Sequence, residues 1–238
     1  MGLKKSTTPI DLGNSGTAVR LLTGLLSAQK FDSVLIGDSS LSKRPMSRII
    51  RPLKEMGAEI ESCSGCLPIS LMGDKNMSSI LYEMPLASAQ VKSSILLASL
   101  YANGETTIIE PNITRDHSER MLRAMKCSIL SRDNKIIMNQ PEKLQSLDMQ
   151  IPGDFSSAAF LIAAFLISNK SSLILRDIGI NSTRIGFLTI IKQMGARIEL
   201  NNIRSFGNEP VADIHLESSR LQGIDIDNPG LVSLSIDE

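Results

Sequence analysis

The stretch Lys54-Glu55-Met56-Gly57-Ala58-Glu59-Ile60 carries the pattern that decides the fold. Similar stretches follow at Arg123-Ala124-Met125-Lys126-Cys127-Ser128-Ile129 and at Lys192-Gln193-Met194-Gly195-Ala196-Arg197-Ile198, and their methionines recur every 69 residues. Each stretch reads as the end of a helix that runs into a strand. A fixed period of this length is typical of a duplicated structural unit.

Each repeat also begins in the same way, with a turn of small polar residues, an apolar helix and an extended strand. These segments cover residues 14–38, 88–111 and 154–177. After the second helix comes a pair of strands, and we expect a third strand at residues 80–83 and again at 147–151. The repeat is therefore helix–strand–helix–strand–strand–strand. Apolar helices should be buried beneath alternating strands, which predicts a layered α/β fold with sheets outside and helices inside.

The composition excludes several classes of protein. Lys and Arg (25) balance Asp and Glu (25), and aromatic residues make up 3%, so we expect neither a nucleic-acid surface nor a membrane surface. We find no apolar run as long as a membrane span, and no signal peptide. Cys63 and Cys66 form a lone CxxC pair and Cys127 is isolated, a pattern that favours free thiols and a cytoplasmic location.

The repeat is cut at both ends of this chain. We expect no strand before the first helix, and the chain stops at Ser235-Ile236-Asp237-Glu238, where a fourth repeat should begin its helix. An open-ended repeat exposes unpaired strand edges. We therefore expect this sequence to be the middle part of a longer protein.

Five helix starts carry small or polar residues suited to binding an anion, because the first N–H groups of a helix have no internal partner. Taken singly, each is more often an ordinary helix cap. Taken together in a repeat, they would converge on one cleft, where Arg44 and Arg115 suit a ligand with phosphate and carboxylate groups. His117 reads as an exposed helical histidine rather than a base. The starts cover residues 12–20, 38–46, 88–92, 114–120 and 152–157.

The sequence shows no metal-ligand cluster and no dinucleotide or Walker motif, so we expect neither a metal nor a cofactor. The five helix starts, however, closely resemble motifs of the 3-phosphoshikimate 1-carboxyvinyltransferase (EPSP synthase) family, most of all its glyphosate-tolerant bacterial branch. The motifs are Gly13-Asn14-Ser15-Gly16-Thr17-Ala18-Val19-Arg20, Gly37-Asp38-Ser39-Ser40-Leu41-Ser42-Lys43-Arg44-Pro45-Met46, Ala87-Ser88-Ala89-Gln90-Val91-Lys92-Ser93, Thr114-Arg115-Asp116-His117-Ser118-Glu119 and Pro152-Gly153-Asp154-Phe155-Ser156-Ser157-Ala158-Ala159-Phe160, with Ser235-Ile236-Asp237-Glu238 as a sixth.

The resemblance implies a fold of six such repeats in two domains, each an inside-out α/β barrel, with substrates bound between them. Residues 1–150 would belong to the first domain and residues 151–238 to the second. The implied reaction transfers the enolpyruvyl group of phosphoenolpyruvate to the 5-hydroxyl of shikimate 3-phosphate and releases phosphate. The implied whole enzyme is a cytoplasmic monomer.

The resemblance also implies roles for residues at matching positions. Asp237 would accept the proton of the 5-hydroxyl. Arg20 and Asp154, at equivalent places in two repeats, could pair across the cleft. The shikimate 3-phosphate residues would be Ser88, Ala89, Gln90, Arg115 and Asp237, the phosphoenolpyruvate residues Gly16, Arg44 and Gln90, and the supporting residues Asn14, Thr17, Thr114, Arg20 and Asp154.

Two alternatives stay open from the sequence. One is an enzyme like the UDP-N-acetylglucosamine enolpyruvyl transferases, although the expected loop cysteine is replaced here by Lys43-Arg44-Pro45-Met46. The other is a binding fragment without catalytic activity. Because the family's terminal phosphate ligands have no counterpart in this chain, we expect the chain alone not to turn over. Gly16 stands where resistant members often carry Ala, so the branch resemblance alone does not imply glyphosate resistance.

Overall fold

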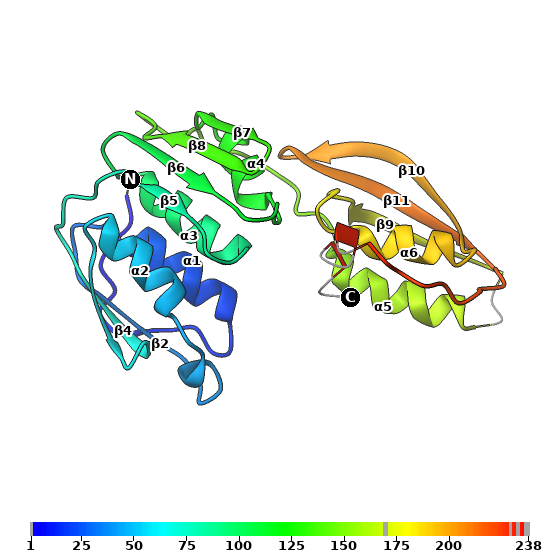
Figure 1. Ribbon diagram of the computed structural model, residues 1–238, viewed down its shortest axis with the longest axis horizontal. Coiled ribbons are helices and arrows are strands. Elements are labelled where there is room, and N and C mark those ends of the chain that lie inside the picture. Colours follow the sequence, from blue (N-terminus) through cyan, green and yellow to red (C-terminus); the bar gives the residue numbers. More distant parts are fainter. Residues whose placement is uncertain (1, 169–170, 229, 232–233, 236–238) are drawn as a thin grey trace. The chain divides into compact units, whose positions relative to one another are not determined.

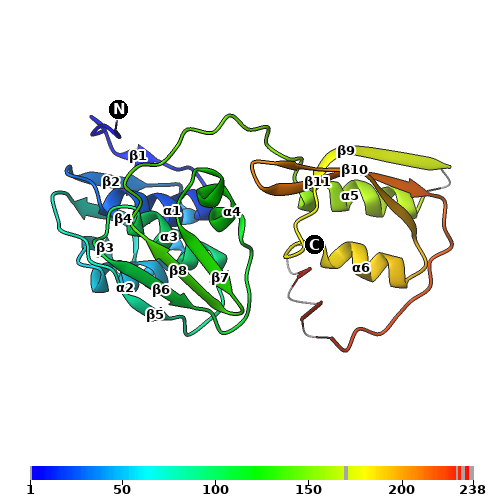
Figure 2. The same ribbon diagram turned by 90° about the horizontal axis from the view of Figure 1, so that it is seen from above.

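The computed structural model describes residues 2–168, 171–228, 230–231 and 234–235 (Figures 1 and 2). Contacts divide the chain into two compact units: Met1–Thr114 with Met125–Gln145, and Arg115–Ala124 with Ser146–Glu238. The elements are β1 (Ile10–Asp11), α1 (Gly16–Ser27), β2 (Ser33–Ile36), η1 (Leu41–Lys43), α2 (Ser47–Glu55), β3 (Glu59–Cys63), β4 (Cys66–Met72), β5 (Leu81–Glu83), α3 (Ala89–Ser99), β6 (Glu105–Ile109), α4 (His117–Ala124), β7 (Ile129–Arg132), β8 (Lys135–Asn139), α5 (Phe155–Leu166), β9 (Ser172–Gly179), α6 (Gly186–Gln193), β10 (Arg197–Phe206) and β11 (Glu209–Glu217).

This order confirms the predicted repeat of helix, strand, helix and strands. The expectation that no strand precedes the first helix is wrong, because Ile10–Asp11 form β1 and pair with β2. Met56 and Met194 each cap the second helix of their repeat, and Met125 directly follows α4. Cys127 lies buried between α4 and β7, as the sequence suggests.

The first unit contains two four-stranded sheets with the same topology. Their strand orders are β1-β2-β4-β3 and β5-β6-β8-β7, and in each the first pair is parallel and the others antiparallel. Helices α1, α2 and α3 pack side by side beneath these sheets (Figure 1). The predicted arrangement of outer sheets and inner helices is confirmed.

Helices α1 and α3 approach each other closely at Gly24. A Cβ atom on Gly24 would lie 2.1 Å from the backbone oxygen of Ser94, inside any van der Waals contact. Ser94 and Thr23 are fully buried at this crossing. The absence of a side chain at Gly24 therefore sets the distance between the two helices.

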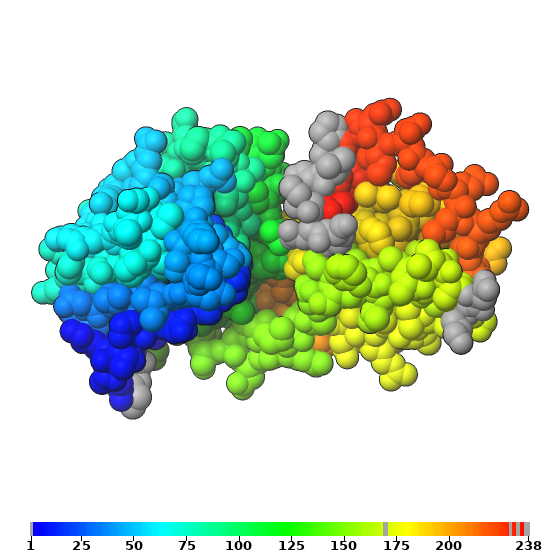
Figure 3. All heavy atoms as spheres, turned by 90° about the horizontal axis from the view of Figure 1, so that it is seen from below, coloured from blue at the N-terminus to red at the C-terminus, as the bar shows by residue number. Residues whose placement is uncertain are grey.

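The second unit holds one repeat, with the three-stranded antiparallel sheet β10-β11-β9 and the helices α5 and α6. Phe155, Ile162, Leu188, Ile198 and Ile214 form the centre of its core. Phe160 and Leu161 of α5 remain exposed, and Figure 3 shows α5 in yellow-green at the surface of this unit. Our expectation that the apolar helices are fully buried is therefore wrong for α5.

The predicted strand at residues 147–151 is also wrong. Residues 141–152 have no regular structure, and the parallel pairing that β1 and β5 make elsewhere is reduced to one bridge between Gly153 and Ile178. The pairing consists of two hydrogen bonds of Gly153: its N–H donates to the backbone oxygen of Asp177 at 2.7 Å, and its own backbone oxygen accepts from the N–H of Gly179 at 3.0 Å.

Helix α4 packs with the second unit although its repeat lies in the first. Arg120 donates from Nη1 to the backbone oxygen of Asn208 at 3.2 Å. Asn181 donates to Asp116 at 2.7 Å, and this amide also donates to Glu209 at 3.1 Å. Among the helices that the structure describes, none is long and apolar enough to cross a membrane.

Gly24→Ala should destabilise the first unit. Alanine normally favours a helix over glycine by about 1 kcal/mol, but here its methyl group would overlap Ser94. We expect a net loss of about 1–3 kcal/mol in the free energy of unfolding, measured with urea. Gly223→Ala adds a methyl that meets nothing within 4 Å and serves as the control. Unchanged or higher stability of Gly24→Ala would contradict the close packing.

Candidate functional site

The start of α1 is built for close approach by other groups. Ser15 caps the helix, and its hydroxyl accepts from the backbone N–H of Ala18 at 3.1 Å. Gly16 is buried, and a Cβ there would lie 2.9 Å from Nη1 of Arg44 and 3.1 Å from Nη1 of Arg20. Glycine therefore leaves room for two guanidinium groups beside the helix N-terminus.

Gln90 connects the starts of α1 and α3. Its amide nitrogen donates to the hydroxyl of Thr17 at 2.8 Å, and its amide oxygen accepts from Nη1 of Arg20 at 2.8 Å. Arg20 also reaches the backbone oxygens of Gly16 and Pro45, at 3.4 and 3.5 Å. The two helix N-termini thus lie together and share one hydrogen-bonded network.

Arg44 lies at the end of η1, where the backbone is extended before α2 begins. Its Nη2 donates to the side-chain oxygen of Asn14. Asn14 in turn donates to Asp38 at 2.7 Å. Asp38 also accepts from the backbone N–H groups of Ser40 and Leu41, at 2.9 and 2.7 Å. The carboxylate therefore holds the η1 turn and, through Asn14, orients Arg44.

The charges in this cluster favour an anion. Burial, and then the positive charges of Arg44 and Arg48, lowers the pKa of Arg20. The pKa of Asp38 is lowered chiefly by the backbone N–H of Leu41 and then by Asn14, so this carboxylate is ionised and engaged within its turn. Two guanidinium groups beside unpaired helix N–H groups can hold a phosphate or carboxylate.

The structure therefore brings together, within the first unit, all three residues expected to bind phosphoenolpyruvate and three of the supporting residues. We call them the Arg20–Arg44 cluster: Asn14, Gly16, Thr17, Arg20, Arg44 and Gln90. Ser88 caps α3, accepting from the N–H of Val91 at 3.4 Å, and Ala89 is the first residue of that helix. Both are partly buried beside Gln90 in the sequence.

The remaining expected residues are placed differently. Thr114, the last residue of the first unit before the crossover, turns its hydroxyl to Glu110. Arg115 and Asp154 belong to the second unit, and the side chain of Arg115 is partly buried and is not free. Asp237 lies outside the residues that the structure describes. The pairing of Arg20 with Asp154 stays a prediction, since each has partners in its own unit.

Asp154 lines a hollow of about 280 Å³ in the second unit. Its carboxylate caps α5 through Ser157, at 2.8 Å from the N–H group, and lies 3.4 Å from Arg184. His117 lines the same hollow, with Nδ1 2.8 Å from Glu209. Its side chain is 43% exposed, so the expectation of a solvated histidine holds only in part.

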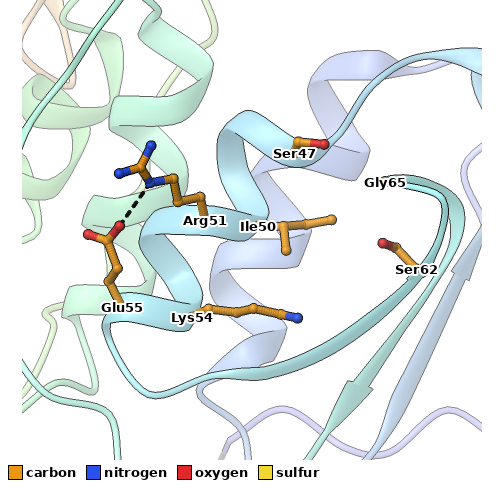
Figure 4. Close-up of a pocket in the computed structure, with 7 residues that line it drawn as sticks. All are labelled: Ser47, Ile50, Arg51, Lys54, Glu55, Ser62 and Gly65. Atoms are coloured by element: carbon orange, nitrogen blue, oxygen red, sulfur yellow. Dashed lines mark hydrogen bonds and ion pairs between the residues drawn. The ribbon is translucent and has the colours of Figure 1, made fainter.

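A second hollow, of about 520 Å³, lies in the first unit between α2 and the β3–β4 turn. Figure 4 shows Ile50 and Lys54 pointing from α2 toward the turn that carries Ser62 and Gly65. Arg51 is paired with Glu55 at 3.1 Å on the other side of the helix (Figure 4). None of the residues that line this hollow belongs to the Arg20–Arg44 cluster, so the hollow does not extend the candidate site.

Two features of the site were missed from the sequence. The sequence shows Asp38 only as part of a helix start. Its role in accepting the N–H groups of Ser40 and Leu41 was missed, although an Asp before Ser-Ser is a common signal for a side chain that closes its own turn. Lys92 and Glu110 form an ion pair with 1% and 2% of the side chains exposed. Among the described residues, no three His, Cys, Asp or Glu side chains are placed to hold a metal ion.

Comparison with known proteins shows the family of the sequence and of the fold. The sequence matches the family described as EPSP synthase (3-phosphoshikimate 1-carboxyvinyltransferase) over residues 2–234. It is 52% identical to 3-phosphoshikimate 1-carboxyvinyltransferase of Ruthia magnifica and 50% identical to that of Legionella pneumophila, over all of this chain and 54% of each relative. A solved EPSP synthase from Acinetobacter baumannii superposes with a TM-score of 0.91 at 49% identity, covering 99% of this chain and 54% of that one.

Asp38→Asn should flatten the acid dependence of stability. Because the folded pKa of Asp38 lies below the ordinary 3.8, its contribution is present above that value and is lost as the pH falls through the lowered one. We expect the variant to be less stable near neutral pH and to lose less between about pH 5 and pH 2. The measurement is the free energy of unfolding by urea against pH.

Asn14→Ala removes one of the three donors to Asp38 and should give a smaller flattening. The same pH slope in wild type and Asp38→Asn would contradict the assignment.

Proposed function

Because the chain belongs to the EPSP synthase family, we propose that it supplies half of an enzyme that transfers the enolpyruvyl group of phosphoenolpyruvate to the 5-hydroxyl of shikimate 3-phosphate. The chain spans about half the length of the relatives it matches, so the activity belongs to the whole enzyme. We keep residues 1–150 and 151–238 as parts of two domains of that enzyme, which we place in the cytoplasm as a monomer.

The observation that carries this proposal is the Arg20–Arg44 cluster. Gly16, Arg44 and Gln90 come from three separate segments, and their side chains and backbone meet beside two helix N-termini. Phosphoenolpyruvate carries a phosphate and a carboxylate, and two guanidinium groups with helix N–H groups match those charges. The family resemblance assigns that ligand to the same residues.

We assign shikimate 3-phosphate to the start of α3 and to Arg115. Gln90 would touch both substrates, because it lies in α3 and is bonded to Thr17 and Arg20. In the reaction the 5-hydroxyl oxygen adds to the central carbon of phosphoenolpyruvate and gives up its proton, for which Asp237 is the proposed acceptor, while the methylene carbon gains a proton and becomes a methyl group. The tetrahedral intermediate then loses phosphate from the central carbon and a proton from that methyl group, which restores the double bond. Fixed cations that orient the phosphate would supply much of the rate.

Of the two alternatives, one is weaker after the comparisons and one stays open. An enzyme acting on UDP-N-acetylglucosamine would share the architecture, but the relatives found are named for the shikimate 3-phosphate reaction. A fragment that binds substrate without turning it over stays compatible with the geometry. Titration with UDP-N-acetylglucosamine would reveal the first alternative by heat of binding that shikimate 3-phosphate does not give.

Arg44→Gln should weaken binding of phosphoenolpyruvate. Isothermal titration of the chain, with shikimate 3-phosphate present, should show heat of binding for wild type and at least about a tenfold higher Kd for the variant. Arg51→Gln is the matched control, because Arg51 is exposed on α2 and pairs with Glu55 rather than with a residue of the cluster. Equal affinity of Arg44→Gln and wild type would overturn the assignment of this cluster.

The isolated chain should release no phosphate above background when both substrates are supplied. The family's further phosphate ligands have no counterpart in this chain. An enzyme that lacks some of the groups that stabilise the charge of the transition state loses most of its rate. Phosphate release can be followed colorimetrically, with a complete relative such as the Legionella pneumophila enzyme as the positive control. Turnover near that of the complete enzyme would refute the half-site.

A further inference from the structure

A lysine is buried in α3 one turn after the residues that we assign to shikimate 3-phosphate. Lys92 has 1% of its side chain exposed, and its Nζ lies 3.0 Å from Oε2 of Glu110, which is 2% exposed. Lysine and glutamate are almost never fully buried unless paired. A buried ion pair usually adds little stability over well-packed apolar residues, because both charges lose their water. Its use here is therefore better sought in geometry than in stability.

The pair closes on a third residue, Thr114. The hydroxyl of Thr114 donates to Oε1 of Glu110, and Lys92 also donates to the backbone oxygen of Thr114 at 3.4 Å. Thr114 thus has both its side chain and its carbonyl held by the same pair. It is also the residue at which the chain leaves the first unit.

Glu110 is itself fixed from another side. It follows β6 directly, its N–H donates to the backbone oxygen of Asn134 at 2.9 Å, and its own oxygen accepts from Nδ2 of Asn134 at 2.9 Å. Asn134 lies in the turn between β7 and β8. Figure 2 shows α3 running alongside β6 and β8, in agreement with the contacts between these elements. The backbone of Glu110 is therefore held by the β7–β8 turn, and its carboxylate is held by Lys92 of α3 and by Thr114.

We propose that Lys92 and Glu110 are positioning residues, which lock Thr114 against α3 and β6 and so fix the end of the peptide that leads into Arg115. This rests on the proposed function, because Arg115 and Ser88 to Gln90 are there assigned to shikimate 3-phosphate. Thr114 acts through this lock rather than by touching the ligand, since its hydroxyl is committed to Glu110.

The test compares Thr114→Val with Thr106→Val. Both remove one hydroxyl from a partly or fully buried threonine, but Thr106 is bonded to Ser99 and lies away from Glu110 in the sequence of β6. Hydrogen exchange of the peptide at residues 112–117 should become about fivefold faster in Thr114→Val and stay unchanged in Thr106→Val. The Kd for shikimate 3-phosphate should rise about fivefold in Thr114→Val only. Thr114→Ser, which keeps the hydroxyl, should restore both.

A second variant guards against effects of unpaired charge. Lys92→Met with Glu110→Gln keeps the buried volume and leaves no isolated charge, and exchange at residues 112–117 should again be faster. Wild-type exchange in both Thr114→Val and the double variant would overturn the lock. Faster exchange in a chain whose wild type shows no heat with shikimate 3-phosphate would support the lock and refute the proposed function, so the two failures are distinguishable.

Discussion

The close contact between α1 and α3 at Gly24 and Ser94 is the constraint on which the first unit depends. These two helices begin equivalent repeats, and the contact lets their backbones meet with no side chain between them. The same approach brings Thr17 and Arg20 within hydrogen-bonding distance of Gln90. The position of Gln90 beside α1 therefore depends on the close packing of the two helices that Gly24 allows.

The Arg20–Arg44 cluster shows how hydrogen bonds can hold like charges together without neutralising them. Asn14 accepts a hydrogen bond from Arg44 and donates one to Asp38, so the carboxylate steadies the turn and acts on the guanidinium through a neutral amide. Gln90 plays a similar part for Arg20 through an uncharged oxygen. The cations keep their attraction for an anionic ligand, while their positions are set by neutral amides.

Much of the fold was predictable, because the period of 69 residues aligns three copies of one pattern and each copy supports the others. The strand at residues 147–151 was not, since its copies elsewhere are only two or three residues long and the pairing here is reduced to the single bridge at Gly153. The site residues Gly16, Arg44 and Gln90 followed from motifs. The burial of Lys92 did not follow from a motif, because the sequence of a helix does not show whether a sheet covers a given lysine side chain. The contact between His117 and Glu209 joins residues 92 positions apart, which no local pattern reveals.

The parallel pairing at the edge of each sheet of the first unit has a consequence for how the repeats are joined. β5 precedes α3 in the chain yet completes the sheet of β6, and β1 stands in the same relation to α1 and β2. Each sheet is thus finished by a strand that the chain has already made before the first helix of that repeat. The repeats interlock, and a break between β5 and α3 would separate a strand from its own covalent continuation. The coil between β4 and β5 is the boundary between the two repeats of the first unit, because all strands of one sheet precede it and all strands of the other follow it. A circular permutation or an inserted domain at this coil would leave every strand beside its partner.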